Sequence, residues 1–502
     1  MGEARRKAML CQTSPVALDT FGGRVHVEWD PQAAVTPLGQ LPFFIEFLKV
    51  SGLLDAWVAD CPLEYKSNNA SEKRDVLVTL LLSILAGHHR YAHITAIRQD
   101  GINPALFGVG QLVSEDTARR ALLKIEESAG IEWMERHLGK TTQDLLSMPW
   151  ILDLDTTVKC LYGKQEGAVV GYNPRKRGRP SHSYHSGLMA NTRLALRVDV
   201  LPGNESAPTH NKRNLWSWFD ALPAGDRPMM IRGDIAYGSE SFLKEAEQRN
   251  QPYLTKVKRS AMVKRLVREL FGGGEWENAG QGWEGKESVL TLSGWSRPRR
   301  VVALRRGIKD GLLLTKAEKN QTKFMFLDKD KAIGGYEYAV LVISTDFPIL
   351  ALAQLYRDRA DAENNFDELK NQWGWGGFTT HDLARCQLVA RMVALVYNWW
   401  TLFVRLAQPN KHFEAISSRP LLLHGVATQT RHGGQTRLTI TSTHDKQAAI
   451  QSILTNLACF LATLKNNAEQ LTDRQRWRSI LCRAFAKFIN VAPPPTLQLV
   501  LT

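Results

Sequence analysis

The sequence predicts a mixed α/β protein in which a β-rich insertion divides an α/β core, with mainly helical regions at both ends. Three patterns predict this class. Apolar strand patterns alternate with helices over residues 146–259 and 346–415, which we assign to the core. Short strand patterns between turn residues fill 260–345, the insertion. Apolar positions at helical spacing dominate residues 1–145 and 416–502.

The composition indicates a polyanionic partner. The 502 residues include 64 Lys and Arg against 50 Asp and Glu, which gives a formal net charge of +14. This balance is typical of nucleic-acid-binding proteins, although many other proteins are basic. The six cysteines form no C-x-x-C pair, which favours free thiols in a reducing compartment. Without a signal-peptide pattern or a long apolar run, we expect a cytoplasmic protein with no membrane segment.

The N-terminal region is expected to be helical after one strand. Residues 24–29 (RVHVEW) alternate as a strand does, whereas 42–56 and 73–98 have helical spacing. His89 and His93 are spaced like a metal-binding pair, but no Glu follows the first and no third ligand is evident. We therefore favour a structural or DNA-backbone role for these histidines.

Residues 114–125 (SEDTARRALLKI) predict a basic helix with Ser114 as its N-cap. The helix fits the recognition helix of a helix-turn-helix unit and fits an ordinary capped amphipathic helix equally well, because the pattern is loose. We expect region 1–145 to bind DNA without assigning the contact to one helix.

Two acids interrupt an apolar strand pattern at residues 149–158 (PWILDLDTTV). Side chains alternate along a strand, so Asp153 and Asp155 face the same side. A buried carboxylate is costly unless it is paired or bound to a metal ion. We therefore expect one of these two acids to be a metal ligand.

A third acid ends another strand pattern. Residues 229–233 lead directly into Asp234, and the carboxyl end of a strand is a common site position in α/β sheets. Residues 253–259 (YLTKVKR) then predict a strand on which Lys256 and Lys258 share a face and would contact DNA phosphates.

A basic loop is predicted at residues 171–179 (GYNPRKRGR), with four cations in five positions. Such a loop is suited to follow a phosphate backbone, and a solvated charged loop is the alternative. The cations are Arg175, Lys176, Arg177 and Arg179.

The insertion is expected to consist of short strands, with tryptophans that either fill its core, as we favour, or stack on an unpaired base. The strands are expected at 289–292, 300–304, 311–314, 323–327 and 338–344. The tryptophans are Trp276, Trp283 and Trp295. A group of arginines makes the insertion a DNA-binding candidate: Arg297, Arg299, Arg300, Arg305 and Arg306.

Residues 280–286 (GQGWEGK) contain a G-x-G-x-x-G pattern that we do not interpret as a nucleotide site. Glu287 stands where a phosphate loop needs Ser or Thr, and a strand pattern follows instead of a helix. We interpret these glycines as turn residues and expect no nucleotide cofactor.

Residues 355–370 (LYRDRADAENNFDELK) contain no Gly or Pro and predict one helix. At about 100° per residue, four functional side chains share a stripe about 60° wide. They are Tyr356, Arg359, Glu363 and Lys370. Asp367 also fits the stripe. The opposite side, expected to face water, carries Asp358, Asp361 and Glu368. A carboxylate beside Arg, Lys and Tyr suits a metal ion next to a phosphodiester.

After this stripe, a long apolar helix is expected at 381–406. The tail should contain a strand at 436–441 and helices at 446–464 and 473–488. We expect region 416–502 to contact DNA or a second subunit.

The spacing of these four stripe residues resembles the Y-R-E-K signature of bacterial insertion-sequence transposases of the DDE class. Residues 162–168 (YGKQEGA) and 171–179 resemble the YGxQEGA and GYNPxKRGR motifs of one branch of that family. Asp155, followed by two threonines, resembles the first catalytic acid of the family, and Asp234 resembles the second.

The resemblance implies a ribonuclease-H-like catalytic core in which Asp155, Asp234 and Glu363 bind two Mg2+ or Mn2+ ions. Tyr356, Arg359 and Lys370 would position DNA phosphate. The implied activity is cut-and-paste transposition by a bacterial, nucleoid-associated enzyme. It would cleave double-stranded DNA at terminal inverted repeats, join it to a target, and form a homodimer in the synaptic complex. Asp153 and Asp367 stay open as alternative acids.

Two other classes of protein remain as alternatives. A sequence-specific DNA-binding protein without catalysis would share the basic surfaces but would have no need of three such acids. A ribonuclease-H-like hydrolytic nuclease would share the acids but would need neither paired ends nor a 3′-hydroxyl product. A strand-transfer assay separates the nuclease from the transposase.

Overall fold

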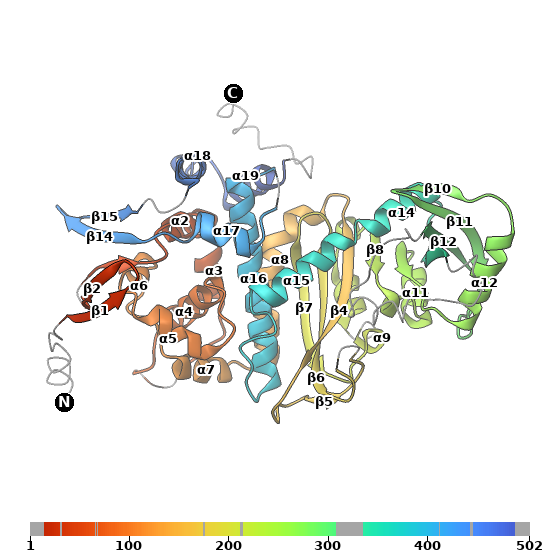
Figure 1. Cartoon of the computed structure of the whole chain (residues 1–502), viewed down its shortest axis with the longest axis horizontal. Coiled ribbons are helices and arrows are strands. Elements are labelled where there is room, and N and C mark those ends of the chain that lie inside the picture. The colour runs from red at the N-terminus through yellow and green to blue at the C-terminus, as the bar shows by residue number, and fades with distance from the viewer. Residues whose placement is uncertain are drawn as a thin grey trace.

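The computed structural model describes residues 15–30, 33–65, 67, 69–173, 176–210, 214–307, 335–410, 412–441 and 445–486. A long central helix, α16 (Leu383–Ala407), stands between a helical region on one side and a large sheet on the other (Figure 1). The predicted mixed α/β class is confirmed.

The large sheet contains ten strands in the described residues and is organised around β4 (Ile151–Cys160). On one side, β6 (Pro180–Met189) is antiparallel to β4, and β7 (Leu194–Pro202) is antiparallel to β6. On the other side, β8 (Met230–Gly233) and then β9 (Tyr253–Lys256) run parallel to β4. The remaining elements of the core before the insertion are β5 (Val169–Val170), α9 (Ala207–His210), α10 (Trp216–Ala221) and α11 (Glu240–Gln248).

The strands of the insertion continue the core sheet instead of forming a sheet of their own. They are β10 (Glu277–Gly280), β11 (Trp283–Leu290), β12 (Arg299–Gly307) and β13 (Tyr336–Ile343). Each is antiparallel to the next, and β13 pairs with β9, with Leu341 opposite Lys256. The strands expected at 311–314 and 323–327 lie outside the described residues. The described strands of the insertion therefore extend the core sheet at the edge of β9.

The insertion also contains a helix that the strand patterns did not predict, α12 (Ala261–Gly272). Ser260 caps it, since its Oγ accepts a bond from Val263 N at 3.3 Å. Val263, Leu266 and Val267 are buried, and their i, i+3, i+4 spacing is helical. The helical signal was present in the sequence but short, and strand patterns follow it closely.

The N-terminal region is helical, as expected, although its predicted helices are divided. Gly52, at φ 68°, separates the first two helices within 42–56. Gly87, at φ 79°, follows the end of the helix that begins at Lys73. Only a glycine adopts this left-handed backbone conformation without strain. The helices are α2 (Leu41–Ser51), α3 (Leu53–Ala59), α4 (Lys73–Leu85), α5 (Ile94–Arg98), α6 (Ile102–Leu106), α7 (Glu115–Leu123) and α8 (Glu127–Leu146).

Two further predictions for this region are confirmed. The expected strand at 24–29 corresponds to β2 (Gly23–Val27), which pairs with β1 (Val16–Thr20). Ser114 caps α7, because its hydroxyl oxygen accepts a bond from Thr117 N at 3.1 Å.

The C-terminal region packs back onto the N-terminal helices. α16 is buried along most of its length and contacts both β7 and α8. After α16, the C-terminal region contains α17 (Ala415–Leu422), β14 (Ala427–His432), β15 (Gln435–Ile440), α18 (Gln447–Asn466) and α19 (Asp473–Phe485). β14 pairs with β3 (Val35–Thr36), which joins the two end regions in one small sheet.

Among the described residues, α18 is the one helix long and apolar enough to cross a membrane by length and composition. Its apolar window has a mean hydropathy of 1.3 and is 33% buried. Leu454, Leu457 and Leu461 are buried, whereas exposed positions such as Ser452 and Asn456 are polar. A core helix passes the same test, so the helix is only weak support for a membrane segment.

Candidate active site

Two carboxylates lie where the parallel pairing of β4 with β8 ends. Leu154 of β4 is opposite Gly233, the last residue of β8. Asp155, in the middle of β4, and Asp234, just after β8, are the next residues along the two strands, and neighbouring strands are about 4.8 Å apart. The strand pairing therefore places the two expected acids side by side.

Backbone amides orient both acids. Asp155 Oδ1 accepts a bond from Thr156 N at 2.8 Å. Asp234 Oδ1 accepts one from Ala236 N at 2.9 Å, at the start of the short helix η4 (Ile235–Tyr237). One oxygen of each carboxylate is thus engaged by the protein backbone.

Asp153, the alternative to Asp155, is held in a buried ion pair. Both Asp153 and Arg232 are 1% exposed. Arg232 Nε and NH2 each donate to a different Asp153 oxygen at 2.7 Å. Arg232 also donates to the carbonyl of Leu355, which ties β8 to the helix that carries Tyr356. The arginine satisfies both oxygens of Asp153, so the geometry favours Asp155 as the site residue.

The single helix expected at 355–370 is wrong, because the structure divides it. α14 (Ile349–Arg357) ends before a two-residue turn, and α15 (Ala360–Gln372) follows. In the turn, Arg359 N donates to Tyr356 O at 3.2 Å, an i to i−3 bond that tightens the backbone.

The guanidinium of Arg359 lies between two of the expected catalytic acids. Its NH2 is 3.6 Å from Asp155 Oδ1, and its NH1 is 2.6 Å from Glu363 Oε1. The Arg359 side chain is 4% exposed, whereas that of Glu363 is 62% exposed. Arg359 therefore links the largely buried Asp155 to the exposed Glu363.

Tyr356 and Lys370 reach the same site despite the break in the helix. Burial raises the pKa of the Tyr356 phenol to about 12, an effect that Arg359 opposes. The charges of Asp234, Glu363 and Asp155 add to this rise, so the phenol lies in the field of all three acids. Lys370 interacts electrostatically with Asp155.

Asp155 is the acid whose ionisation the site perturbs most clearly. Burial raises its pKa to about 6, and the neighbouring Asp234 adds to the rise. Arg359, the Thr156 amide and Lys370 lower the pKa and offset part of this effect. A perturbed carboxylate beside a second acid is the arrangement that a bound cation would stabilise.

Asp155 and Asp234 fit a divalent cation by their chemistry. Carboxylate oxygens are the ligands that Mg2+ and Mn2+ prefer, and a cation would relieve the repulsion between the two acids. Within the described residues, no three His, Cys, Asp or Glu side chains are grouped closely enough to hold one metal ion. Glu363 is paired with Arg359 instead, so its role as a third ligand stays a prediction.

The remaining acids of α15 have other partners. Asp367 is exposed and accepts a bond from Asn371 Nδ2 at 2.7 Å. The expectation that Glu368 faces water is wrong, since it is 1% exposed. Its oxygens bond Ala415 N and a ring nitrogen of His412, each at 2.9 Å, because the start of α17 covers that face of α15.

Two histidines of the N-terminal region, His89 and His93, contact each other. His93 Nδ1 accepts a bond from His89 N at 3.4 Å, which favours a structural role over a metal pair. The rings of His88 and His93 also meet edge to face, 5.3 Å apart. Burial lowers the pKa of His89, with His93 as a further cause.

The cations assigned to DNA contact outside the signature residues lie in two places. Lys176, Arg177 and Arg179 are exposed, and Arg175 lies outside the described residues. Lys256 is half-buried at the end of β9, and Lys258 is exposed. Because β9 ends at Lys256, the expectation that both lysines share one strand face is wrong.

Each of the five arginines that made the insertion a DNA-binding candidate is paired with a glutamate. The pairs are Arg297–Glu247, Arg299–Glu240, Arg300–Glu287, Arg305–Glu284 and Arg306–Glu337. Three of these arginines also cover the tryptophans: Trp276 lies under Arg305, Trp283 under Arg306 and Trp295 under Arg299. All three tryptophans pack against a hydrophobic core, in agreement with the interpretation that we favoured. The predicted turn glycines, Gly280 and Gly282, have φ of 80° and 76°.

Sequence reasoning missed Arg232, the residue that distinguishes Asp153 from Asp155. Its signal was a lone arginine in the apolar strand 229–233, since a cation is rarely buried without a paired acid. It also missed Lys159, which lies on the same face of β4 as Asp155.

Comparison with known proteins identifies a family to which the sequence is similar. The model of the family described as "Transposase DDE domain group 1" matches residues 46–461. No curated protein matches the chain significantly. Among solved structures, a cryo-EM structure of the piggyBac transposase synaptic complex with hairpin DNA is similar at 11% sequence identity. The match covers 92% of this chain and 89% of that one, but its TM-score of 0.33 is too low to support an argument about fold or function.

Proposed function

Because the chain belongs to the Transposase DDE domain group 1 family, we propose that it is a transposase of a bacterial insertion sequence. The family implies a metal-dependent enzyme that cleaves and transfers DNA. One observation carries the proposal for this chain. The pairing of β4 with β8 places Asp155 beside Asp234, and Arg359 joins Asp155 to Glu363.

We assign Asp155, Asp234 and Glu363 as the catalytic residues, with the first two as the principal metal ligands. Two Mg2+ or Mn2+ ions, when bound, would activate a water or a 3′-hydroxyl and stabilise the leaving 3′ oxygen. Tyr356, Arg359 and Lys370 would bind phosphate oxygens, because arginine, lysine and a phenol donate hydrogen bonds to anionic oxygen. Arg359 would neutralise charge at the site both with and without DNA.

Two finer assignments accompany this proposal. We take the core to be ribonuclease-H-like, which is supported by antiparallel neighbours on one side of β4 and parallel neighbours on the other. We take the chain to belong to the Y-R-E-K branch, which is supported by the spacing of its four signature residues and by residues 162–168 and 171–179.

The proposed substrate is double-stranded DNA. We propose that region 1–145 binds terminal inverted repeats, that a homodimer forms the synaptic complex, and that transposition is cut-and-paste in the bacterial cytoplasm. The exposed basic loop, Lys176 to Arg179, would bind backbone phosphates.

The decisive experiment compares two acids of α15. Linear DNA carrying the sequences that flank the gene on both sides is incubated with Mg2+ and with wild type, Glu363→Gln or Asp367→Asn. Each substitution removes one negative charge from an exposed side chain with little change of shape. We expect wild type and Asp367→Asn to cleave at the element ends and Glu363→Gln to bind without cleaving.

The other outcomes separate the alternatives. Loss of cleavage in Asp367→Asn alone would make Asp367 the third acid. Binding without cleavage by the wild type would favour a DNA-binding protein without catalysis. Cleavage that never leads to strand transfer into a second duplex would favour a hydrolytic nuclease.

A further inference from the structure

A groove of about 700 Å³ adjoins the candidate active site. Its walls come from the short helix η1 (Tyr91–His93), the first turns of α7, the distal half of β4 and the turn that follows α15. The helical N-terminal region and the catalytic core thus form it together. The volume is within the range of sites that hold a ligand of nucleotide size.

The groove is continuous with the catalytic face of β4. Alternate residues of a strand face the same side, so Asp155, Thr157 and Lys159 point the same way. Thr157 and Lys159 line the groove, and so does Lys370, whose charge acts on Asp155. At about 3.4 Å per residue, Lys159 is about 14 Å along β4 from Asp155. This length exceeds the axial rise of one nucleotide, about 3.4 Å per strand, so Lys159 lies beyond the scissile phosphate.

The charge of the groove is positive. Four cations line it, Arg90, Arg119, Lys159 and Lys370, against one acid, Glu115, and Arg119 lies 3.4 Å from Asp116. Aromatic side chains complete the walls, including Tyr162 and Phe378. Cations beside aromatic surfaces are the elements with which proteins bind a nucleic acid strand.

Of these cations, Lys159 is the one that β4 carries. It is half-buried, and its Nζ donates to the hydroxyl of Thr379. No ion pair of Lys159 with an acid is present among the described residues, unlike the arginines of the insertion. Burial lowers the pKa of Lys159 to about 8. An anion that entered the groove would supply the missing opposite charge.

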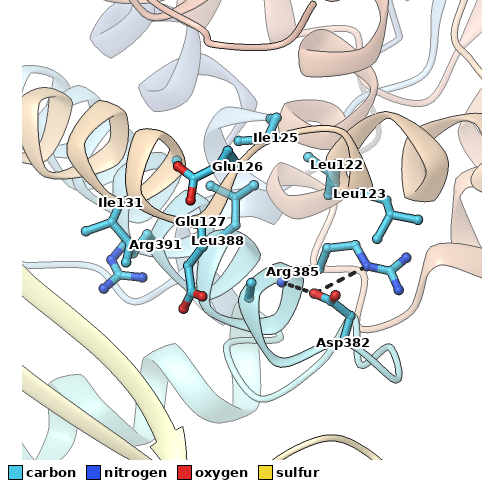
Figure 2. A pocket seen from close by; sticks show the side chains of 12 residues that line it. Leu122, Leu123, Ile125, Glu126, Glu127, Ile131, Asp382, Arg385, Leu388 and Arg391 are labelled. Atoms are coloured by element: carbon cyan, nitrogen blue, oxygen red, sulfur yellow. Dashed lines mark hydrogen bonds and ion pairs between the residues drawn. The ribbon is translucent and has the colours of Figure 1, made fainter.

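A second cavity provides a contrast. It lies between α7, α8 and α16 and has a volume of only about 50 Å³ (Figure 2). Both arginines that line it are already paired with a carboxylate. Arg385 lies against Asp382 (Figure 2). Arg391 donates a hydrogen bond to Asp199 at 2.7 Å. Small size and neutralised charge make that cavity a packing feature.

We propose that the groove binds the sugar–phosphate backbone of the DNA strand that passes through the active site, with Lys159 contacting a phosphate other than the scissile one. The inference rests on the proposed function, because it requires DNA at Asp155. It extends the binding surface from the four residues of the signature to the junction between the N-terminal region and the core.

The test measures how DNA affinity depends on salt. A fluorescent duplex carrying one element end is titrated with protein in EDTA at several salt concentrations. Each phosphate contact contributes about 0.9 to the slope of log K against log salt concentration. We expect Lys159→Gln to reduce the magnitude of the slope by about 0.9. The matched control, Lys244→Gln, removes the charge of an exposed lysine of α11 and should leave the slope unchanged.

A slope for Lys159→Gln equal to that of Lys244→Gln would overturn the inference. If circular dichroism shows that Lys159→Gln does not fold, Arg90→Gln, at an exposed position of the groove, decides by the same criterion. Failure of the proposed function is seen separately, as absence of cleavage by the wild type in Mg2+. In that case the same slopes are measured with a duplex of arbitrary sequence, since phosphate contacts do not depend on sequence.

Discussion

Replacing Asp153 by asparagine should destabilise the protein far more than replacing an exposed acid. Asp153 and Arg232 are both 1% exposed, and two hydrogen bonds of 2.7 Å join them. Asparagine keeps the shape of the side chain but leaves a buried guanidinium without an opposite charge. Breaking a buried pair in this way costs about 3–5 kcal/mol.

The assay is urea unfolding followed by circular dichroism, with a double-mutant cycle. Asp153→Asn and Arg232→Met should each lower the free energy of unfolding by about 3–5 kcal/mol. The double variant Asp153→Asn/Arg232→Met should lose much less than the sum, because no unpaired charge is left buried. Asp116→Asn is the control, since Asp116 pairs with Arg120 at the surface, where a pair contributes about 0–1 kcal/mol.

Equal costs for Asp153→Asn and Asp116→Asn would refute this reasoning. They would show that the buried pair does not hold Asp153 and that its carboxylate is free for another role. If Asp153→Asn folded normally but lost cleavage, Asp153 would replace Asp155 as the proposed metal ligand.

Three further predictions concern ionisation and DNA contact. In EDTA, the free energy of unfolding should fall as the pH rises from about 4 to above 6, by up to about 3 kcal/mol. The reason is that burial raises the folded-state pKa of Asp155 to about 6, so the folded protein holds this proton more tightly than the unfolded chain. Urea unfolding at several pH values in this range measures the effect. In Asp155→Asn, this contribution to the pH dependence of the free energy of unfolding should disappear. Neutralising Lys176, Arg177 and Arg179 together should reduce the salt slope of DNA binding by about 2–3, measured by fluorescence titration. Arg306→Gln should leave that slope unchanged in the same titration, because Glu337 already neutralises this arginine.

The local parts of the candidate site could be predicted from sequence. Strand alternation gave the common face of Asp153 and Asp155, and the end of a strand pattern gave Asp234. The choice between Asp153 and Asp155 required a partner from another strand, Arg232, which lies 79 positions away. Pairing between distant strands leaves no periodic trace in the sequence, so this choice needed the structure.

The insertion shows the same limit. Short strands were predictable from their turns, but their addition to the edge of β9 was not, because sheet order depends on contacts between distant segments. The arginines appeared in the sequence as an available positive patch. Their glutamate partners are far from them along the chain, as with Arg299 and Glu240, 59 positions apart. Counting cations therefore overestimated the charge that the insertion offers to DNA.

The structure brings Tyr356, Arg359 and Glu363 close together although the single helix was predicted wrongly, and the geometry of the turn explains why. A tight turn advances about 120° per residue where an α-helix advances about 100°. Over the two residues between α14 and α15, the error in phase is only about 40°, smaller than the width of the stripe. Tyr356 therefore still faces the site that Arg359 and Glu363 share. The failure at Glu368 has a different origin, because its burial depends on α17, which covers the opposite face of α15. The angular positions of side chains around a helix change little at a short break, so the periodicity of the sequence still predicts which side chains lie on the same side. The exposure of that side depends on which other elements pack against it, and the periodicity does not contain this information.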